Sequence, residues 1–304
     1  MPGYGIVVVG FGSGGEIGPC LDRVLETGAP AVVVDNSADP RSREETLRRG
    51  LPLIENPANL GFAAAVNQGI EALREPLILL LNADVYLETG IDLLAAACEN
   101  PATAGASGTL VGPGGAQRGF MVRRLPTPLA LGLEVLLVNR LWPGNPVNWH
   151  YRCMGLDYAR SQDVEQPAAA FLMIRRDVWS RLGGFDAGFW PLWFEDVDFC
   201  ARARRLGYRF RFVPGVVAKH TGGHTVGRIP LEQRQLYWYG NLLRYAAKHF
   251  SNRARALVVL AVMTGSVMRM VMGIARQWSL APVVVFGKVA AMAGREAVRL
   301  AGLR

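Results

Sequence analysis

The first 90 residues of the chain alternate between short apolar runs and stretches with helical spacing. The runs 5–9, 31–34 and 77–81 are continuously apolar and consist mainly of Val, Ile and Leu. Such runs indicate strands that are buried on both faces, as in a parallel sheet. Between them, apolar residues recur at helical spacing in 17–25 and 63–73. The pattern predicts an α/β fold with a mostly parallel central sheet flanked by helices.

The second half of the chain is less regular. Residues 101–165 have mixed polarity and are often interrupted by Gly and Pro, and we interpret them as a mobile insertion that could cover a substrate site. Apolar runs at 168–174 and 216–220 predict two further strands, and the alternation at 208–213 is typical of an edge strand. A helix is predicted at 198–206, ending at a glycine.

Helices are predicted in the last 80 residues. The stretch 231–250 is rich in Tyr and Trp, and two uncharged runs follow at 256–268 and 277–287. A helix needs about 20 apolar residues to span a membrane, so we expect neither of these shorter runs to span one. The predicted structure of residues 226–304 is a helical extension.

The net charge of +8 is distributed unevenly. Residues 1–201 hold 15 Lys/Arg and 23 Asp/Glu, whereas residues 202–304 hold 18 Lys/Arg and 2 Asp/Glu. So basic a segment indicates an anionic partner. Basic, apolar helices that are too short to span are typical of peripheral contact with a membrane. The alternative is that they pack on the rest of the chain or on a second subunit of a homo-oligomer. No nucleic-acid-binding motif accompanies the charge, so we expect no nucleic acid partner.

The composition is that of a folded protein in a reducing compartment. Half of the 304 residues are hydrophobic, which permits a sizeable core. The four Cys residues are widely spaced and form no CxxC pair, so we expect neither a zinc site nor a disulfide framework. The N-terminus lacks the basic and apolar regions of a signal peptide. We therefore expect a cytoplasmic protein, located at the cytoplasmic face of the membrane through its basic extension.

Polar residues follow the first predicted strands. Asp35 lies at the carboxyl end of the second strand, where open α/β sheets bind ligands, although Asp is also a common turn residue. Asn59 and Gly61 precede a predicted helix and could present amide groups to a ligand. The glycine-rich segment 10–15 misses the GxGxxG spacing by one residue, which argues against a dinucleotide site.

Three further residues are candidate metal ligands. Asn82 and Asp84 leave the strand 77–81 two residues apart, and His220 ends the last predicted strand. Carboxylate and amide oxygens next to substrate phosphates are the usual ligands of Mg²⁺ or Mn²⁺, and an imidazole can complete the set. The alternatives are a simple turn after the strand and a surface histidine.

Three carboxylates lie within four residues in an aromatic surrounding. Glu195, Asp196 and Asp198 follow Trp193 and Phe194. Burial among aromatic rings raises a carboxyl pKa and can prepare a general base. The alternative is that the acids stabilise the first turn of the following helix. The two interpretations are compatible.

Together these motifs resemble a known family. They occur in the order Asp35–Ser37, Asn59–Gly69, Asn82–Asp84, Ala169–Arg176, Gly183–Asp186, Phe194–Cys200 and His220. The sequence resembles the family-two inverting glycosyltransferases of GT-A fold, and within them the rhamnosyltransferase-like branch. The resemblance covers about residues 4–225. It implies a catalytic domain at 1–225, with a nucleotide-sugar half at 1–100 and an acceptor half at 101–225, followed by the extension.

The resemblance also implies roles for single residues. Asp35 matches the residue that contacts the nucleotide base, and Asp196 matches the catalytic base. Asn82 and Asp84 match the ends of the metal-binding DxD motif, and His220 matches a metal-binding His near the donor diphosphate. The Asn at the first position leaves one negative charge fewer on the cation.

The expected substrates complete the interpretation. We expect the loop residues Asn59 and Gly61, and Trp193 and Glu195 beside the base, to bind substrate. The donor would be a dTDP- or UDP-sugar, such as dTDP-rhamnose, and the acceptor a glycan or lipid-linked glycan in polysaccharide biosynthesis. Two alternatives remain. One is a glycoside hydrolase, which needs two carboxylates across the sugar. The other is a non-catalytic membrane-binding protein of the same fold.

Overall fold

The chain forms two compact units in the computed structural model, which describes residues 3–277 and 280–302. The sheet unit comprises residues 1–125 and 155–228, and the helical unit comprises residues 126–154 and 229–304. Residues 126–154 thus belong to the same unit as the C-terminal helices. The predicted domain boundary near residue 225 stays a prediction.

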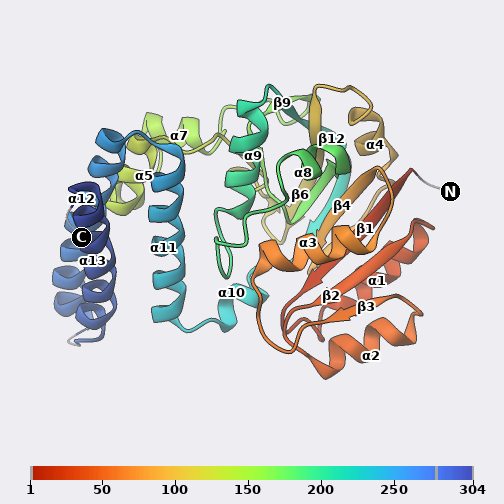
Figure 1. Cartoon of the computed structure of the whole chain (residues 1–304), viewed down its shortest axis with the longest axis horizontal. Helices are drawn as coiled ribbons and strands as arrows, with labels where there is room; N and C mark the ends of the chain where they lie inside the picture. Colours follow the sequence, from red (N-terminus) through yellow and green to blue (C-terminus); the bar gives the residue numbers. More distant parts are fainter. Residues whose placement is uncertain (1–2, 278–279, 303–304) are drawn as a thin grey trace. The chain divides into compact units, whose positions relative to one another are not determined.

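A ten-stranded mixed sheet forms the core of the sheet unit (Figure 1). Its main order is β3-β2-β1-β4-β11-β6-β12-β5, with β7 paired to β6 and β9 to β12, and β8 and β10 form a separate pair. The strands are β1 (Tyr4–Gly10), β2 (Ala31–Asp35), β3 (Leu53–Glu55), β4 (Leu77–Asn82), β5 (Val85–Leu87), β6 (Thr103–Gly112), β7 (Gly115–Ala116), β8 (Val122–Arg123), β9 (Gln162–Val164), β10 (Gln166–Pro167), β11 (Phe171–Arg175) and β12 (Arg209–His220). Strands β3, β2, β1 and β4 are parallel, as the continuous apolar runs predict.

Helices pack on this sheet and connect its strands. They are α1 (Ile17–Glu26), α2 (Pro40–Arg48), α3 (Phe62–Ala72), α4 (Asp92–Ala97), α8 (Arg176–Arg181), α9 (Glu195–Arg205) and α10 (His224–Arg228). Helix α3 packs on β1 and β2, and α4 packs on β6 and β12. Because β3, β2, β1 and β4 run parallel, their carboxyl ends lie at one edge of the sheet. The polar residues that follow these strands lie at that edge.

Strand β6 corrects the interpretation of residues 101–165 as an insertion. It lies inside the sheet, between β11 and β12. Its sequence is rich in Gly and Ala because the neighbouring backbones lie very close. A Cβ atom on Gly105 would lie 2.4 Å from the Met173 carbonyl oxygen, and one on Gly108 would lie 2.2 Å from that of Val216. The small residues that permit this approach also remove the branched-residue signal of a strand.

Strand β12 corrects a second expectation. The two predicted strands at 208–213 and 216–220 form one strand, Arg209–His220, with a register shift between Phe212 and Val217. The first part is not an edge, because it pairs with β6 on one side and β9 on the other. The last part pairs with β5 and brings His220 opposite Val85.

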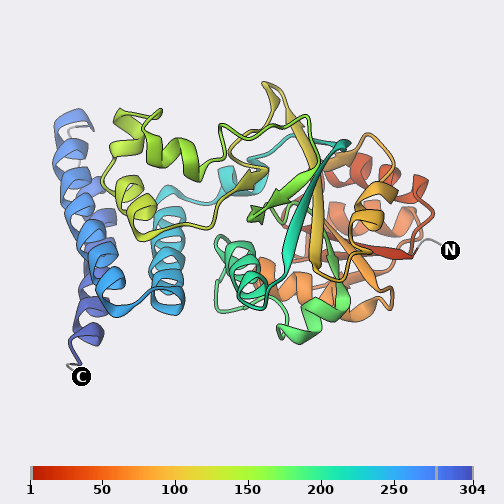
Figure 2. The ribbon, with the colours of Figure 1, turned by 90° about the horizontal axis from the view of Figure 1, so that it is seen from above.

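The helical unit consists of α5 (Pro128–Val135), α6 (Val138–Leu141), α7 (Pro146–Tyr151), α11 (Leu231–His249), α12 (Asn252–Gln277) and α13 (Ala281–Leu300). Helices α12 and α13 run side by side (Figures 1 and 2), and α12 also packs on α5 and α11. Pro282 lies in the first turn of α13, a position that tolerates proline. Residues 278–279 of the predicted run 277–287 lie outside the described residues.

Helix α12 is longer than its uncharged run predicts. By length and composition, Asn252–Ala275 could cross a membrane, which corrects the expectation that the apolar runs are too short. The same composition also occurs in core helices of soluble proteins. Here, however, only 28% of the most apolar window is buried. The helix therefore exposes apolar surface to its surroundings.

Candidate active site

The three candidate metal ligands converge at the end of β4. Asn82 ends that strand and Asp84 follows two residues later, in the turn to β5. Pairing of β12 with β5 places His220 beside this turn, and the Thr221 amide donates to the Asp84 carbonyl at 3.2 Å. The His220 Nε2 atom lies 3.6 Å from an Asp84 carboxylate oxygen.

Gln117 orients the imidazole of His220. Its Nε2 atom donates to the His220 carbonyl at 3.0 Å, so its Oε1 atom is the group that faces the ring. That oxygen lies 2.7 Å from His220 Nδ1, which must therefore carry a proton and donate it. In a neutral ring the lone pair is then on Nε2, the nitrogen beside Asp84. Phe120 stacks on the same ring at 5.2 Å and restricts its rotation.

These residues fit a hard divalent cation that also binds substrate phosphates. The Asn82 Oδ1 atom is buried, and no group in the described part of the chain donates to it. An orphaned buried oxygen beside a carboxylate is what a Mg²⁺ or Mn²⁺ site requires. Among the described residues, no group of three or more His, Cys, Asp or Glu side chains could hold a metal ion by itself. Asp84 and His220 would therefore bind a cation only together with Asn82 and with phosphate oxygens of the substrate.

The acidic segment begins with a strained turn. Trp193 and Phe194 have φ angles of 74° and 71°, in the left-handed region that bulky residues rarely adopt. Helix α9 starts at Glu195 directly after this turn, and among the described groups no side-chain hydrogen bond caps it. Strain of this kind is typical of functional sites, where the surrounding structure enforces it.

Asp196 is held by groups from β10 and from the segment between β10 and β11. Its Oδ2 atom accepts hydrogen bonds from Gln166 Nε2 at 3.1 Å and from the Ala169 amide at 3.3 Å. One residue further, the Ala170 carbonyl accepts from the Asn82 amide at 3.1 Å. Two adjacent residues of one segment thus contact both the carboxylate and the residue at the candidate metal site.

The environment of this segment disfavours charged carboxylates. Burial raises the pKa of Asp196, against hydrogen bonds that lower it. Burial also raises the pKa of Glu195, and the neighbouring Asp196 raises it further. The Glu195 Oε2 atom is buried, and no donor among the described residues reaches it. Both carboxyl groups are therefore expected to take up protons at a higher pH than exposed ones.

The third carboxylate has a structural role. Asp198 is fully buried and forms an ion pair with Arg202 at 2.7 Å. The same guanidinium donates to the carbonyls of Leu182 and Gly184 at 2.7 and 2.9 Å, which fixes the glycine turn before the acidic segment. Asp198 therefore stabilises the fold by holding Arg202 in place.

Asp35 organises the loop after β2. One of its carboxylate oxygens accepts from the Ser37 amide and hydroxyl, and the other accepts from the Asp39 amide at 2.6 Å. The residue is fully buried, and burial raises its pKa despite these bonds. Ser37 in turn accepts from the Gly12 amide at 2.8 Å, so the loop is tied to the glycine segment. Direct contact between Asp35 and a nucleotide stays a prediction.

Amide side chains join the Asn59–Gly61 loop to the end of β2. Asn59 Oδ1 accepts from Asn36 at 2.9 Å and from the Gly61 amide at 2.8 Å. Gly61 has a φ of 89°, and a Cβ atom there would lie 3.0 Å from Trp190. Trp190 Nε1 donates to the Asn59 carbonyl at 3.1 Å. The candidate nucleotide loop is thus packed on the aromatic segment that precedes the acids.

Three residues of the site were not predicted from the sequence. Gln117 contacts His220 from 103 residues away, and Gln166 contacts Asp196 from 30 residues away. Trp190 holds the Asn59 loop, a contact that spans 131 residues. Gln117 belongs to no local pattern. Trp190 lies in the aromatic stretch around the acidic cluster and Gln166 lies just before the apolar run 168–174, so the positions of these two offered a signal, although their contacts did not.

The chain belongs to glycosyl transferase family 2. The sequence model of that family matches residues 6–177, more than half of the chain, and a second model, described as glycosyl transferase family group 2, matches residues 146–294. The predicted family is thereby confirmed.

Two curated proteins resemble the chain. The low-salt glycan biosynthesis hexosyltransferase Agl10 of Haloferax volcanii is 24% identical over 205 residues, which are 66% of this chain and 61% of that protein. The rhamnosyltransferase WbbL of Escherichia coli K12 is 34% identical over 61 residues, which are 20% of this chain and 23% of that protein. The chain thus spans less than two thirds of the length of either relative.

Solved structures confirm the GT-A fold. The mannosyltransferase PcManGT from Pyrobaculum calidifontis, in complex with GDP-Man and Mn²⁺, matches with a TM-score of 0.52 and 15% identity over 98% of this chain and 86% of that one. Staphylococcus aureus TarS 1–349 with UDP-GlcNAc matches with a TM-score of 0.56 and 14% identity over 99% of this chain and 83% of that one. At such identities the likeness establishes the fold alone.

Proposed function

We propose that this protein is an inverting glycosyltransferase that moves a sugar from a nucleoside diphosphate to a hydroxyl group of a glycan or lipid-linked glycan. The observation that carries the proposal is the bridge formed by residues 169 and 170. Through it, the candidate base Asp196 and the candidate metal site at Asn82 contact one short segment. The likeness to WbbL supports rhamnose, from dTDP-rhamnose, as the donor sugar.

The proposed reaction is a single displacement. Asp196 takes the proton of the acceptor hydroxyl while the oxygen bonds to the anomeric carbon of the donor. The bond from that carbon to the diphosphate breaks in the same step, so the configuration inverts and no covalent enzyme intermediate forms. Gln166 and the Ala169 amide position the carboxylate. A hydrolase would need a second carboxylate across the sugar. Asp198 is bound to Arg202 and cannot serve, which leaves only Glu195 of the three clustered acids for that role.

The donor would bind along the carboxyl edge of the parallel strands. Asp35 and the loop at Asn59 and Gly61 would contact the nucleoside, and Trp193 and Glu195 would contact the sugars. Asp84, His220 and Asn82 would hold Mg²⁺ or Mn²⁺, which supplies positive charge to stabilise the departing diphosphate. PcManGT was solved with Mn²⁺, in agreement with such a cation.

A thermal-shift screen tests the donor site. The unfolding midpoint should rise with dTDP or UDP in the presence of Mn²⁺ or Mg²⁺, because a ligand that binds only the folded state stabilises it. Asp84→Ala should abolish the metal-dependent part of the rise. At a nucleotide concentration 100 times the Kd, that rise corresponds to about 2.7 kcal/mol.

Asp92→Ala is a suitable control for this screen. Asp92 lies in α4, and its carboxylate accepts from the Tyr4 hydroxyl, away from the strand-end residues. This variant should lower the basal midpoint but keep the full nucleotide response. The donor-site proposal fails if no nucleotide shifts the midpoint with either metal, or if Asp84→Ala responds as the unsubstituted protein does.

We also propose that the helical unit makes peripheral contact with an anionic membrane. Large apolar side chains on α12 are exposed at helical spacing: Leu257, Leu260, Val267, Val271 and Ile274 are 44–65% exposed. They form one stripe along the helix, because their spacings of three, four and seven residues return to the same face. The helical unit also carries 13 Lys/Arg and 3 Asp/Glu, a net charge of +10. Apolar stripe and positive charge together favour the cytoplasmic face of a bilayer.

Vesicle flotation tests this contact. The protein should float with phosphatidylglycerol vesicles. The double substitution Leu260→Glu with Val267→Glu should weaken vesicle binding at least about tenfold, because two apolar side chains are then no longer transferred from water into the bilayer. Leu206→Glu is the control, since Leu206 is 49% exposed but lies in the sheet unit. Equal flotation of all three proteins would exclude the stripe as the contact.

A further inference from the structure

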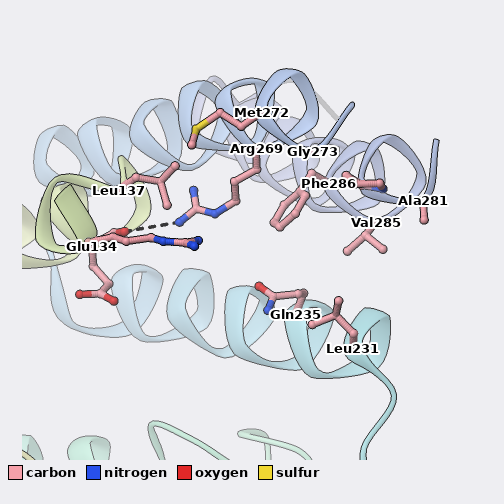
Figure 3. Close-up of a pocket in the computed structure, with 12 residues that line it drawn as sticks. Glu134, Leu137, Leu231, Gln235, Arg269, Met272, Gly273, Ala281, Val285 and Phe286 are labelled. Atoms are coloured by element: carbon pink, nitrogen blue, oxygen red, sulfur yellow. Dashed lines mark hydrogen bonds between the residues drawn. The ribbon is translucent and has the colours of Figure 1, made fainter. Parts of the chain in front are cut away.

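A cavity of about 690 Å³ lies inside the helical unit (Figure 3). Its walls come from α5, α6, α11, α12 and α13 and from Leu137, which precedes α6. Most of the lining side chains are apolar, among them Leu137, Met272, Val285 and Phe286. This volume lies within the range of small-molecule sites in proteins, which is about 300–1,000 Å³. The proposed sugar transfer uses none of these residues.

Arg269 places a positive charge at this cavity. Its guanidinium donates to the carbonyls of Val135 and Gly265, the latter at 3.0 Å, and it lies 5.7–5.8 Å from the ring centres of Phe286 and Tyr239. In Figure 3 it points into the space between the helices, as does Gln235 from α11. Burial lowers the pKa of this arginine, because the charged form has lost water.

Arg269 has no acid in direct contact, although the Glu134 carboxylate favours its charge from a longer distance. No carboxylate in the described part of the chain forms an ion pair with it. The carboxylate of Glu134, which also lines the cavity, accepts from Asn139 at 2.7 Å and lies 3.7 Å from Arg152. A second guanidinium, Arg140, lines the cavity from an exposed position and makes no hydrogen bond or ion pair through its side chain to another described residue. Arg269 is partly buried, and a charge that has lost water is normally neutralised by a partner.

We propose that this cavity binds the phosphate group and the first part of the alkyl chain of an anionic amphiphile. Arg140 and the remaining N–H groups of Arg269 would bind the phosphate oxygens, and Gln235 could donate a further hydrogen bond. The apolar wall around Val285 and Phe286 would receive the chain. The cavity can hold a headgroup and a few methylene groups, whereas a whole lipid would extend beyond it. This site does not depend on the proposed sugar transfer.

Hexyl phosphate is the probe for this site, measured by thermal shift and titration calorimetry on the full chain. It should bind more tightly than inorganic phosphate or 1-hexanol, because only hexyl phosphate satisfies both the guanidinium groups and the apolar wall. Arg140→Gln should weaken binding about tenfold or more, since hydrogen bonds to charged groups contribute about 1.5–3 kcal/mol. Val285→Trp should abolish binding by filling the chain site.

Two further variants keep the test decisive. Arg253→Gln is the matched control, since Arg253 is an exposed arginine of α12 that does not line the cavity, and it should bind hexyl phosphate normally. If Val285→Trp does not fold, Ala281→Leu replaces it as a smaller obstruction at the same wall. Arg269 itself is not substituted, because its bond to the end of α5 supports the fold.

The outcomes separate the site from simpler explanations. Equal binding of inorganic phosphate, undiminished by Val285→Trp, would overturn the amphiphile in favour of an anion site. Equal binding of 1-hexanol would reduce the site to an apolar cavity, and equal weakening by Arg253→Gln would indicate non-specific charge. Vesicles of phosphatidic acid then identify the source. If Val285→Trp floats with them less than Arg253→Gln does, the site binds membrane headgroups, and if the two variants float equally, the site binds an amphiphile outside the bilayer.

Discussion

Asp196→Asn should lower the rate of sugar transfer about 10²–10⁴-fold, the usual contribution of a general base. The substitution keeps the shape of the side chain, and an amide oxygen can still accept from Gln166 and the Ala169 amide. It removes the basic electron pair that takes the acceptor proton. Metal-dependent binding of the nucleotide should persist, because Asp196 does not belong to the proposed metal site.

The pH profile of the unsubstituted enzyme tests the same assignment. Burial raises the pKa of Asp196 above its ordinary value of 3.8. Since the base works only when deprotonated, kcat/KM should fall as the pH drops through this raised pKa, at a higher pH than for an exposed aspartate. The residual activity of Asp196→Asn should lack this acidic limb.

Asp177→Asn is the matched control for these measurements. Asp177 is an exposed carboxylate of the sheet unit that pairs with Arg175, and its removal should change the rate less than twofold. The assignment of the base is wrong if Asp196→Asn transfers sugar within a few-fold of the unsubstituted rate. Loss of nucleotide binding in Asp196→Asn would instead indicate damage to the donor site.

The parts of the fold that the sequence predicted are those with a local signal. Strands β1, β2 and β4 are continuous apolar runs, and their burial on both faces follows from that pattern alone. Strand β6 lies equally deep in the sheet, but Gly105 and Gly108 interrupt the apolar pattern by which a buried strand is recognised in a sequence. Its small residues are dictated by backbones that lie far away in the sequence, which no local pattern can report.

The site divides in the same way. Asn82, Asp84, Asp196 and His220 were predicted because strand ends and acidic clusters are visible in the sequence, although their roles stay predictions. Gln117 was invisible, because its importance comes entirely from its bonds to His220 across the sheet. Residues that orient ligands act through tertiary contacts, and they therefore need a structure to be found.

The length of α12 was misjudged because a charged residue interrupts its apolar run. Arg269 marks the end of that run in the sequence, but the helix continues to Gln277. The guanidinium is accommodated by carbonyls of Gly265 and α5 and by two aromatic rings. A charge inside an apolar helix therefore marked a contact, and not the end of the helix.

Asp198→Ala should destabilise the protein by about 3–5 kcal/mol, the cost of leaving one member of a buried ion pair without its partner. Asp198 is fully buried and the Arg202 side chain is only 17% exposed, so water can replace the lost bond only in part. The bonds from Arg202 to the Gly183–Gly184 turn should loosen with it. The measurement is the free energy of unfolding from urea denaturation, compared at one pH.

Two further proteins separate this effect from simple loss of charge. Glu26→Ala breaks the exposed pair of Glu26 with Arg23, 3.0 Å apart, and should change the free energy of unfolding by less than about 1 kcal/mol. Asp198→Leu combined with Arg202→Met removes both charges and should recover part of the loss, because no buried guanidinium then lacks an acid. If Asp198→Ala costs no more than Glu26→Ala, the pair does not support the fold, and Asp198 returns as a candidate second acid beside Asp196. A large loss with partial recovery would assign the two aspartates of one short motif to different tasks, one to the chemistry and the other to the turn that holds it.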